Sequence, residues 1–399
     1  MEPPLKGIKV LDFTRVIAGS FCTMYLADLG AEVIKIEMPE YGEVMRYQPP
    51  VKNGESGFFI TLNRGKKSVT LNLKSPETKE IVHKLIKNVD VVVENFKPGV
   101  MKELGFDYES LKKVNPAIVY ASISGFGQYG PNSDLPSYDL CIQAMCGLMS
   151  MNGYPGMTPM RIGNSITDYM SGVLSVVGIL CALRVRDSAP EGQGKGQYID
   201  ISMFDAGMTM LENSITRYDI TGEVAGLIGS HHPSAAPHNI YHTSDGYVAI
   251  LIIDNNSWKR LTKVMGRPKL GEDPEFATIE ARLKNVDRVD EIMEEWTQSK
   301  TSQEVMEIFN THGFACGTVH KVNEVMESEQ VSAREMLVTV DQPQLGKLKI
   351  PGCPIKFSET PVQIGEPAPL NGQHTQEVLC EMLGYSAEEY EGFKKNKVV

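Results

Sequence analysis

The sequence predicts an α/β protein whose largest part is built on a parallel β-sheet. Three observations support this fold class. Segments typical of strands alternate with segments typical of helices over the first third of the chain, and glycine or proline residues often stand between them. The connections between successive strands are also long enough to contain a helix, as parallel strands require. We therefore expect β-α-β units with right-handed crossovers.

The first of these units begins close to the N-terminus. Lys9–Phe13 is a short apolar strand, Phe21–Leu29 is a helix closed by Gly30, and Ala31–Glu37 is a second strand. The pattern then repeats along the chain. The further strands expected are Ser68–Leu73, Asp90–Glu94, Ala117–Ser124 and Lys195–Ser202. Three further helices are expected: one that begins at Ser75-Pro76, one over Val100–Val114 and one over Met203–Asp219.

A long apolar segment, Met170–Arg184, predicts a helix that is buried on nearly all sides. Its apolar run, Val173–Leu183, is interrupted by Ser175 and Gly178. This run is too short to cross about 30 Å of hydrocarbon. We therefore expect no membrane-spanning segment.

The pattern changes after residue 222. Residues 222–237 are rich in Gly, Ser, His and Pro, and two apolar strands then flank Ser-Asp-Gly within Ile240–Ile252, which is a strong hairpin signal. Helical segments follow at Trp258–Met265 and Val289–Phe309. We therefore expect a separate, smaller α+β domain over roughly 225–320. The elements expected beyond it are helices at Val322–Met336 and Thr375–Leu383 and strands at Val338–Val340 and Ile355–Phe357.

The charge balance argues against a nucleic-acid-binding protein. The 399 residues include 39 Lys and Arg against 50 Asp and Glu, a net charge of −11, whereas phosphate backbones require a basic face. The seven cysteines are widely spaced, match neither a zinc site nor a CxxC pair, and follow no secretory signal. We expect a soluble cytoplasmic protein with reduced cysteines and no metal site.

General cofactor and nucleophile motifs give no assignment. The loop Thr14–Ser20 has one glycine instead of the three of a dinucleotide-binding fingerprint, so Glu37 is expected to be a solvated strand end rather than a ribose ligand. Arg64–Lys67 is expected to be a solvated basic loop, with a phosphate site as the alternative. His231-His232 fits a surface linker better than a metal site. No G-x-S-x-G motif indicates a hydrolase serine.

Asp168 is the acidic residue with the most informative position. It follows a loop of small and polar residues, Arg161–Thr167, and stands directly before the long apolar helix. An aspartate at such a position is normally a helix N-cap. The same unpaired amides would keep a carboxylate ionised and could hold an oxyanion beside it, as a nucleophilic carboxylate requires. Both roles stay open on these residues alone.

A series of segments along the whole chain resembles the family III CoA-transferases, a group that includes formyl-CoA:oxalate and carnitine-type CoA-transferases. The resemblance extends from Leu5 to Val399. The segments that carry it are Leu5–Gly19, Leu29–Glu37, Asn63–Ser68, Asn72–Lys74, Asp90–Gly99, Ser124–Pro131, Tyr138-Asp139, Thr167–Tyr169 and Gly194–Ser202.

The resemblance implies a fold and a set of site residues. The family combines a Rossmann-like large domain, made from N- and C-terminal parts, with a small domain, and two such chains form an interlocked homodimer. For this chain it implies a large domain at 1–224 and 321–399 around a small domain at 225–320. Asp168 matches the nucleophilic aspartate. The residues that match the coenzyme A site are Ile17 and Ala18 in the first loop, Leu71, Asn72, Leu73 and Lys74 near the adenine and ribose phosphate, Asn95, Phe96 and Lys97 along the pantetheine channel, and Tyr138 and Asp139 near the thioester.

The chain departs from the family pattern at a few positions. Ser20 replaces a common proline. Met38 and Glu103 stand where formyl-CoA transferases have arginines, and Lys102 is the nearest substitute at the second position. Pro233–His238 occupies the place of a tetraglycine loop, which argues against formyl-CoA and oxalate as substrates.

The implied reaction moves coenzyme A from an acyl-CoA to a free carboxylic acid through an aspartyl anhydride and an aspartyl-CoA thioester, with no permanently bound cofactor. Two alternatives remain. A 2-methylacyl-CoA racemase of the same fold needs a histidine before an aspartate, but the corresponding stretch is Ser137-Tyr138-Asp139. The second alternative is a non-catalytic CoA-binding protein, which applies if Asp168 serves only as a helix cap. The methionines of the candidate acyl pocket favour a hydrophobic or mid-sized acid; they are Met145, Met149, Met151 and Met160.

Overall fold

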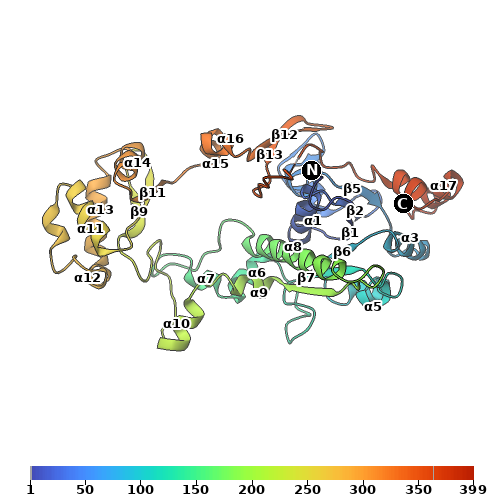
Figure 1. Ribbon diagram of the computed structural model, residues 1–399, viewed down its shortest axis with the longest axis horizontal. Helices are drawn as coiled ribbons and strands as arrows, with labels where there is room; N and C mark the ends of the chain where they lie inside the picture. The colour runs from blue at the N-terminus through green and yellow to red at the C-terminus, as the bar shows by residue number, and fades with distance from the viewer. Residues whose placement is uncertain (1, 363) are drawn as a thin grey trace. The chain divides into compact units, whose positions relative to one another are not determined.

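The computed structural model describes residues 2–362 and 364–399, which form two compact units (Figure 1). The large unit comprises Met1–Leu148, Arg161–Ile215 and Glu329–Val399. The small unit comprises Met149–Met160 and Thr216–Ser328. Three separate stretches of the chain therefore build the large unit, and the functional residues discussed below belong to it.

A six-stranded parallel sheet forms the centre of the large unit, which confirms the predicted α/β class. Its strands are β1 (Lys9–Asp12), β2 (Glu32–Glu37), β5 (Lys67–Thr70), β6 (Val91–Glu94), β7 (Val119–Ser124) and β8 (Tyr198–Ser202). The strand order is β5-β2-β1-β6-β7-β8, so the direction of chain progression reverses between β1 and β6. In open parallel sheets, ligands bind outside the carboxyl ends of the strands at such a reversal.

Apolar helices cover both faces of this sheet. On one face, β-branched residues of the strands pack against α1 (Ala18–Asp28) and α8 (Ile166–Asp187). The other face packs against α3 (Pro76–Ile86), α4 (Val100–Leu104), α5 (Tyr108–Leu111), the π-helix η3 (Glu377–Met382) and α17 (Ala387–Lys395). The remaining elements of the large unit are η1 (Val44–Tyr47), β3 (Val51–Lys52), β4 (Glu55–Ser56), α2 (Gly57–Asn63), α6 (Asp139–Met145), α9 (Met203–Met208), α16 (Glu329–Ala333), β12 (Leu337–Gln342) and β13 (Gly346–Pro351).

The small unit is built on an antiparallel sheet with the order β11-β10-β9. The predicted hairpin is present as β9 (His238–His242) and β10 (Tyr247–Leu251), and β11 (Ala315–Thr318) pairs with β10. Its helices are α11 (Asn255–Val264), η2 (Pro268–Gly271), α12 (Ile279–Lys284), α13 (Val286–Thr297), α14 (Ser302–Thr311) and α15 (Val322–Glu327), while α7 (Leu148–Met151) and α10 (Ser214–Thr221) lie at the unit boundaries.

Several predicted helices are divided. Val100–Val114 separates into α4 and α5 because Gly105 adopts a left-handed φ of 77° and ends α4. Val289–Phe309 separates into α13 and α14 because Thr301 forms a capping box with Glu304 and starts a new helix. The helical period was correctly recognised in each case, but the internal stop signals were not.

The C-terminal end also differs from expectation. The expected strand Ile355–Phe357 is absent from the described residues, and β13 pairs with β12 instead. The helix expected at Thr375–Leu383 is the π-helix η3, and a further helix, α17, follows it. Ser386 and Glu389 form the capping box of α17, so the S-x-x-E pattern was a signal for this helix that the sequence analysis missed.

Helix α8 differs from expectation in its length and in its burial. It has 22 residues and, among the described residues, it is the one helix long and apolar enough to cross a membrane by length and composition. It packs against α1 and β7, as a core helix does. It is not buried on all sides, because Val173, Val177 and Leu180 are 41%, 51% and 36% exposed. These residues are spaced by four and three, so they form one apolar stripe on the helix.

Candidate active site

Asp168 is not the cap of its own helix. Helix α8 begins at Ile166, so Asp168 is its third residue. The first-turn amide of Thr167 donates instead to Asp139 at the start of α6, at 3.0 Å, and the Thr167 hydroxyl donates to the same oxygen at 2.8 Å. The N-cap prediction is therefore wrong, since a carboxylate from another helix has taken that role.

Asp168 faces the N-terminus of a different helix, α1. Helix α1 has no side-chain cap at Ile17 and no acidic residue in its first turn. The amide of Ala18, the first residue of α1, acts on the Asp168 carboxylate and lowers its pKa, and both residues line the same cavity. The carboxylate thus lies beside an amide that the helix leaves unpaired, at the positive end of the helix dipole.

Two glycines allow this close approach. A Cβ atom on Gly172, one turn after Asp168, would lie 2.7 Å from the carbonyl oxygen of Ala18. A Cβ atom on Gly19 would lie 2.4 Å from the methyl group of Thr14. Side chains at either position would push α8 away from α1 or deform the loop before α1.

The Asp168 carboxyl is a weak acid. Burial, and then the negative charge of Asp139, raise the pKa of Asp168 to about 7, although the Ala18 amide lowers it. The sequence analysis expected helix-start amides to hold this group ionised. The shift has the opposite sign because one amide does not offset the loss of water and a neighbouring carboxylate.

Asp168 lines a cavity of about 370 Å³ at the carboxyl ends of β6 and β7. Five more of the expected residues border it, namely Ala18, Asn95, Phe96, Lys97 and Tyr138. Of the methionines expected in the acyl pocket, Met145, Met149, Met151 and Met160, this lining contains none, and Met203 lies there instead.

A second cavity, of about 450 Å³, adjoins the first. It is lined by the expected nucleotide-binding stretch, Leu71, Asn72, Leu73 and Lys74. Arg15 and Phe96 line both cavities. An elongated ligand that occupied both would therefore pass these two side chains.

The two loops at the strand-order reversal are tied together. The Arg15 amide donates to Asn95 Oδ1 at 2.8 Å, and Asn95 Nδ2 donates to the Arg15 carbonyl at 2.7 Å. The Arg15 guanidinium lies 4.8 Å from the centre of the Phe96 ring. The sequence analysis missed Arg15, although its place in the loop after β1 was a signal for the ligand site.

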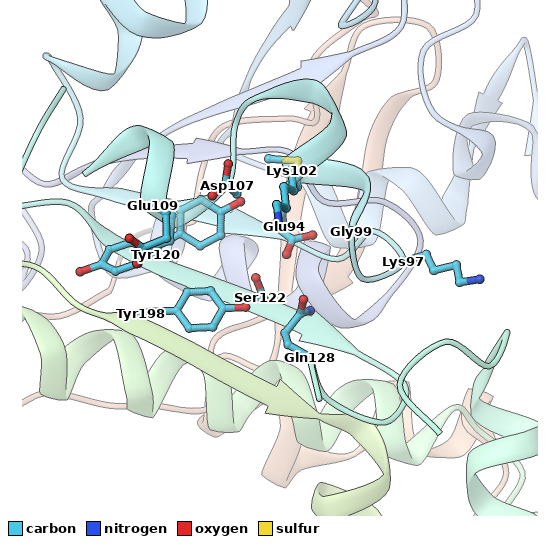
Figure 2. Close-up of a pocket in the computed structure, with 12 residues that line it drawn as sticks. Glu94, Lys97, Gly99, Lys102, Asp107, Glu109, Tyr120, Ser122, Gln128 and Tyr198 are labelled. Atoms are coloured by element: carbon cyan, nitrogen blue, oxygen red, sulfur yellow. The ribbon is translucent and has the colours of Figure 1, made fainter. Parts of the chain in front are cut away.

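The remaining expected residues lie away from these two cavities. Ile17 is buried as the residue before α1, and Asp139 is buried at the start of α6, from where its charge acts on Asp168. Lys102 borders a third cavity of about 310 Å³, whereas Glu103 borders the second one. Figure 2 shows the third cavity, with Lys97 extending away from its centre.

The third cavity contains a buried acid. Glu94 is 3% exposed, and burial raises its pKa to about 7 against the hydrogen bonds of Ser122 and the Phe96 amide. Figure 2 shows Glu94, Ser122 and Tyr198 around the same space. Because the Phe96 amide donates to Glu94 Oε2 at 2.8 Å, this acid also anchors the loop that borders the other two cavities.

The basic and acidic groups expected to be solvated are paired. Arg64 is buried against Asp28, Lys66 against Asp12, and Lys67 pairs with Glu32. They therefore form neither a solvated loop nor a phosphate site.

Glu37 is also paired, because Arg46 donates to both of its carboxylate oxygens. It is 3% exposed rather than a solvated strand end. His231, expected in a surface linker, pairs with Asp290. Within residues 2–362 and 364–399, no group of three or more His, Cys, Asp or Glu side chains is arranged so that it could hold a metal ion.

Comparison with known proteins gives consistent matches over the full chain. The sequence profile of CoA-transferase family III matches residues 5–375. The succinyl-CoA–D-citramalate CoA-transferase of Chloroflexus aurantiacus is 33% identical over 99% of this chain and 98% of that protein. The formyl-CoA:oxalate CoA-transferase of Streptomyces avermitilis is 37% identical over the whole of both chains. The crystal structure of a CaiB/BaiF family protein from Brucella suis is similar with a TM-score of 0.85 and 34% identity, over 96% of this chain and 100% of that one.

Proposed function

Because the chain belongs to CoA-transferase family III and is an acyl-CoA:carboxylate CoA-transferase, we propose that Asp168 is the nucleophile through which it moves coenzyme A. One observation carries this proposal. The Asp168 carboxylate borders a cavity and lies against the first amide of α1. A nucleophilic carboxylate needs both access to substrate and a donor for the developing oxyanion.

The first half of the reaction forms a mixed anhydride. The ionised carboxylate of Asp168 attacks the thioester carbonyl of the donor, the C–S bond breaks, and coenzyme A leaves as a thiolate. The thiolate then attacks the aspartyl carbonyl of the anhydride. This step releases the donor acid as a carboxylate and leaves an aspartyl-CoA thioester on the protein.

The second half runs in the opposite direction with a new acid. The acceptor carboxylate attacks the aspartyl thioester and displaces the thiolate, and the thiolate attacks the acyl carbonyl of the new anhydride. The products are a new acyl-CoA and free Asp168. Over the whole cycle one thioester and one free carboxylate are exchanged for another thioester and another free carboxylate, so the protein needs to exclude water from the anhydrides and to stabilise oxyanions.

The arrangement of the two cavities supports the placement of coenzyme A. We assign the nucleotide to the cavity of Leu71–Lys74 and the pantetheine arm to the passage beside Asn95, Phe96 and Lys97. The thioester then reaches the cavity of Asp168. Lys74 is a cation available to the phosphates in the nucleotide cavity.

We propose a dicarboxylic acid as acceptor. The acids named for the two relatives, D-citramalate and oxalate, are both dicarboxylic. Arg15 and Lys97 border the cavity of Asp168, where a second carboxylate would find a counter-ion.

We also propose that the molecule is an interlocked homodimer in which residues 1–224 and 321–399 act as one Rossmann-like domain and 225–320 as the small domain. The exposed stripe of Val173, Val177 and Leu180 on α8 supports a protein contact there.

Val177→Lys should lower the mass measured by light scattering to that of a monomer. Interlocked subunits carrying different tags should exchange only after unfolding and refolding, so exchange in native buffer would argue against interlocking.

The experiment that tests the nucleophile is covalent trapping. Purified protein is incubated with succinyl-CoA and a panel of dicarboxylic and monocarboxylic acids, and products and peptides are read by mass spectrometry. We expect new acyl-CoA species and a coenzyme A adduct on the peptide that contains Asp168, and neither with Asp168→Ala. Deuterium exchange at the α-carbon without coenzyme A transfer would indicate a racemase, and binding without either reaction would indicate a CoA-binding protein.

A further inference from the structure

A cluster of buried charges lies beneath the loop that precedes α1. Lys35, Asp12, Lys66 and Glu43 are 0% to 5% exposed. Lys66 pairs with Asp12 at 3.1 Å, and Lys35 lies 3.5 Å from Glu43. Burial of charged groups is costly, and apolar residues of similar volume often give equal or greater stability. The chemistry assigned to Asp168 makes no direct use of these groups.

The cluster binds the backbone of the loop. Lys35 Nζ donates to the Thr14 carbonyl at 2.8 Å, and the Val16 amide donates to Glu43 Oε2 at 3.2 Å. With the bonds between Arg15 and Asn95, three consecutive residues of the loop are each held through the backbone.

The residue held at the end of this series has an unfavourable conformation. Val16 has a φ of 59°, in the left-handed region. A β-branched residue rarely adopts this region, because its side chain clashes with the backbone there. Such strain persists only where the surroundings over-determine the conformation, and it is concentrated at functional sites.

The strained residue lies close in sequence to the donor beside the nucleophile. Two residues after Val16, Ala18 lines the same cavity as Asp168, and its amide acts on the Asp168 carboxylate. Rotation of Val16 into an ordinary backbone region would turn Ile17 and the first amide of α1 away from the carboxylate.

We propose that Lys35 and Glu43 are positioning residues for the transfer reaction: they hold Val16 in its left-handed conformation so that the Ala18 amide meets Asp168. This inference rests on the proposed role of Asp168. It explains why the chain keeps buried charges at this place.

A matched control is available at the other end of the same helix. Asp28 is the last residue of α1 and accepts two hydrogen bonds from the buried Arg64 guanidinium, at 3.0 and 2.6 Å. Arg64→Met breaks a buried ion pair of α1 without touching the loop before it. It should lower the thermal midpoint as much as Lys35→Met does and leave kcat within about threefold.

The test compares Lys35→Met and Glu43→Gln with this control. Loss of an oxyanion donor reduces kcat by about 10²–10³-fold, so a displaced one should cost about 10–100-fold in kcat. We expect KM for the acyl-CoA to change less than threefold. Val16→Gly in the Lys35→Met background should bring kcat back to within about threefold of wild type, because glycine adopts a positive φ without strain.

A readout that needs no turnover separates this inference from the proposed function. Asp139 from α6 and the Ala18 amide from α1 act on the Asp168 carboxyl, and Arg15 and Lys97 border its cavity. NMR titration of ¹³C-labelled aspartate, assigned with Asp168→Asn, should show a higher pKa of Asp168 in both loop variants and no change in Arg64→Met. An unchanged pKa, or an equal loss of kcat in Arg64→Met, would overturn the positioning role. If the pKa of Asp168 shifts in the loop variants but the wild-type protein has no transferase activity, the nucleophile assignment is rejected, and the role of Lys35 and Glu43 in placing the Ala18 amide is kept.

Discussion

Two aspartates, the buried Asp12 and the partly buried Asp168, lie next to the same helix, α1, yet their surroundings differ in the features that matter for reactivity. Asp12 accepts hydrogen bonds from the Thr14 amide, the Thr23 hydroxyl and the Lys66 ammonium group. Burial alone would raise its pKa, but Lys66 and Lys35 bring the pKa below the ordinary value of 3.8. Asp168 has one backbone amide and a neighbouring carboxylate, and its pKa rises to about 7. A carboxylate with several partners supports the fold, and one that is left short of partners can react.

The largest expected effect comes from removing the reactive carboxylate. Asp168→Asn should reduce transfer by at least about 10⁴-fold, as losing a nucleophile does in other enzymes. It should also stabilise the protein. The folded-state pKa of Asp168 is raised from 3.8 to about 7, so its ionisation reduces stability as pH rises through that window. Thermal midpoints measured at pH 8 should be higher for Asp168→Asn than for wild type, and equal below pH 4. A lower midpoint at pH 8 would show that Asp168 serves the fold.

The matching change at Asp12 should have the opposite consequence. Asp12→Asn leaves Lys66 buried without its counter-ion, which should cost about 3–5 kcal/mol in the free energy of unfolding. The folded-state pKa of Asp12 is lowered, so its contribution is present above pH 4 and is lost as pH falls through the lowered pKa. Denaturant unfolding should therefore show a larger difference from wild type at pH 7 than at pH 3.

The difference between the two aspartates marks the limit of what the sequence could predict. All six strands of the parallel sheet were predicted, because short apolar runs between glycine and proline residues are local signals. Asp168 could be selected as a candidate, but the direction of its pKa shift could not be predicted, since it depends on burial in the folded chain and on Asp139, which lies 29 positions earlier. Arg64 and Lys66 were expected in solvent for the same reason: their partners, Asp28 and Asp12, lie 36 and 54 positions away.

The close approach of the Ala18 amide to Asp168 depends on the absence of a side chain at Gly172. Gly172→Ala would place a methyl group 2.7 Å from the Ala18 carbonyl, so α8 and α1 must separate. A misplacement of about 1 Å typically costs about 10²-fold in rate, and we expect a loss of this size in kcat. Gly178→Ala is the control on the same helix, because its methyl group would meet the side chain of Ile199 at 3.1 Å and not the loop. Equal losses in both variants would mean that α8 is sensitive to any added volume.

The smallest effect separates the two causes of the raised pKa. Asp139→Asn removes the like charge and keeps a side-chain oxygen that can accept the Thr167 amide, so the pKa of Asp168 should fall. A fall of about one unit would raise the ionised fraction at pH 6 about fivefold, and kcat/KM at that pH should rise in proportion. The pH–rate profile of Asp139→Asn should have its acid limb at lower pH than wild type, while Asp139→Glu, which keeps the charge, should not. If the limb does not move in Asp139→Asn, burial alone sets the pKa, and the contrast with Asp12 comes from the missing cations rather than from the added carboxylate.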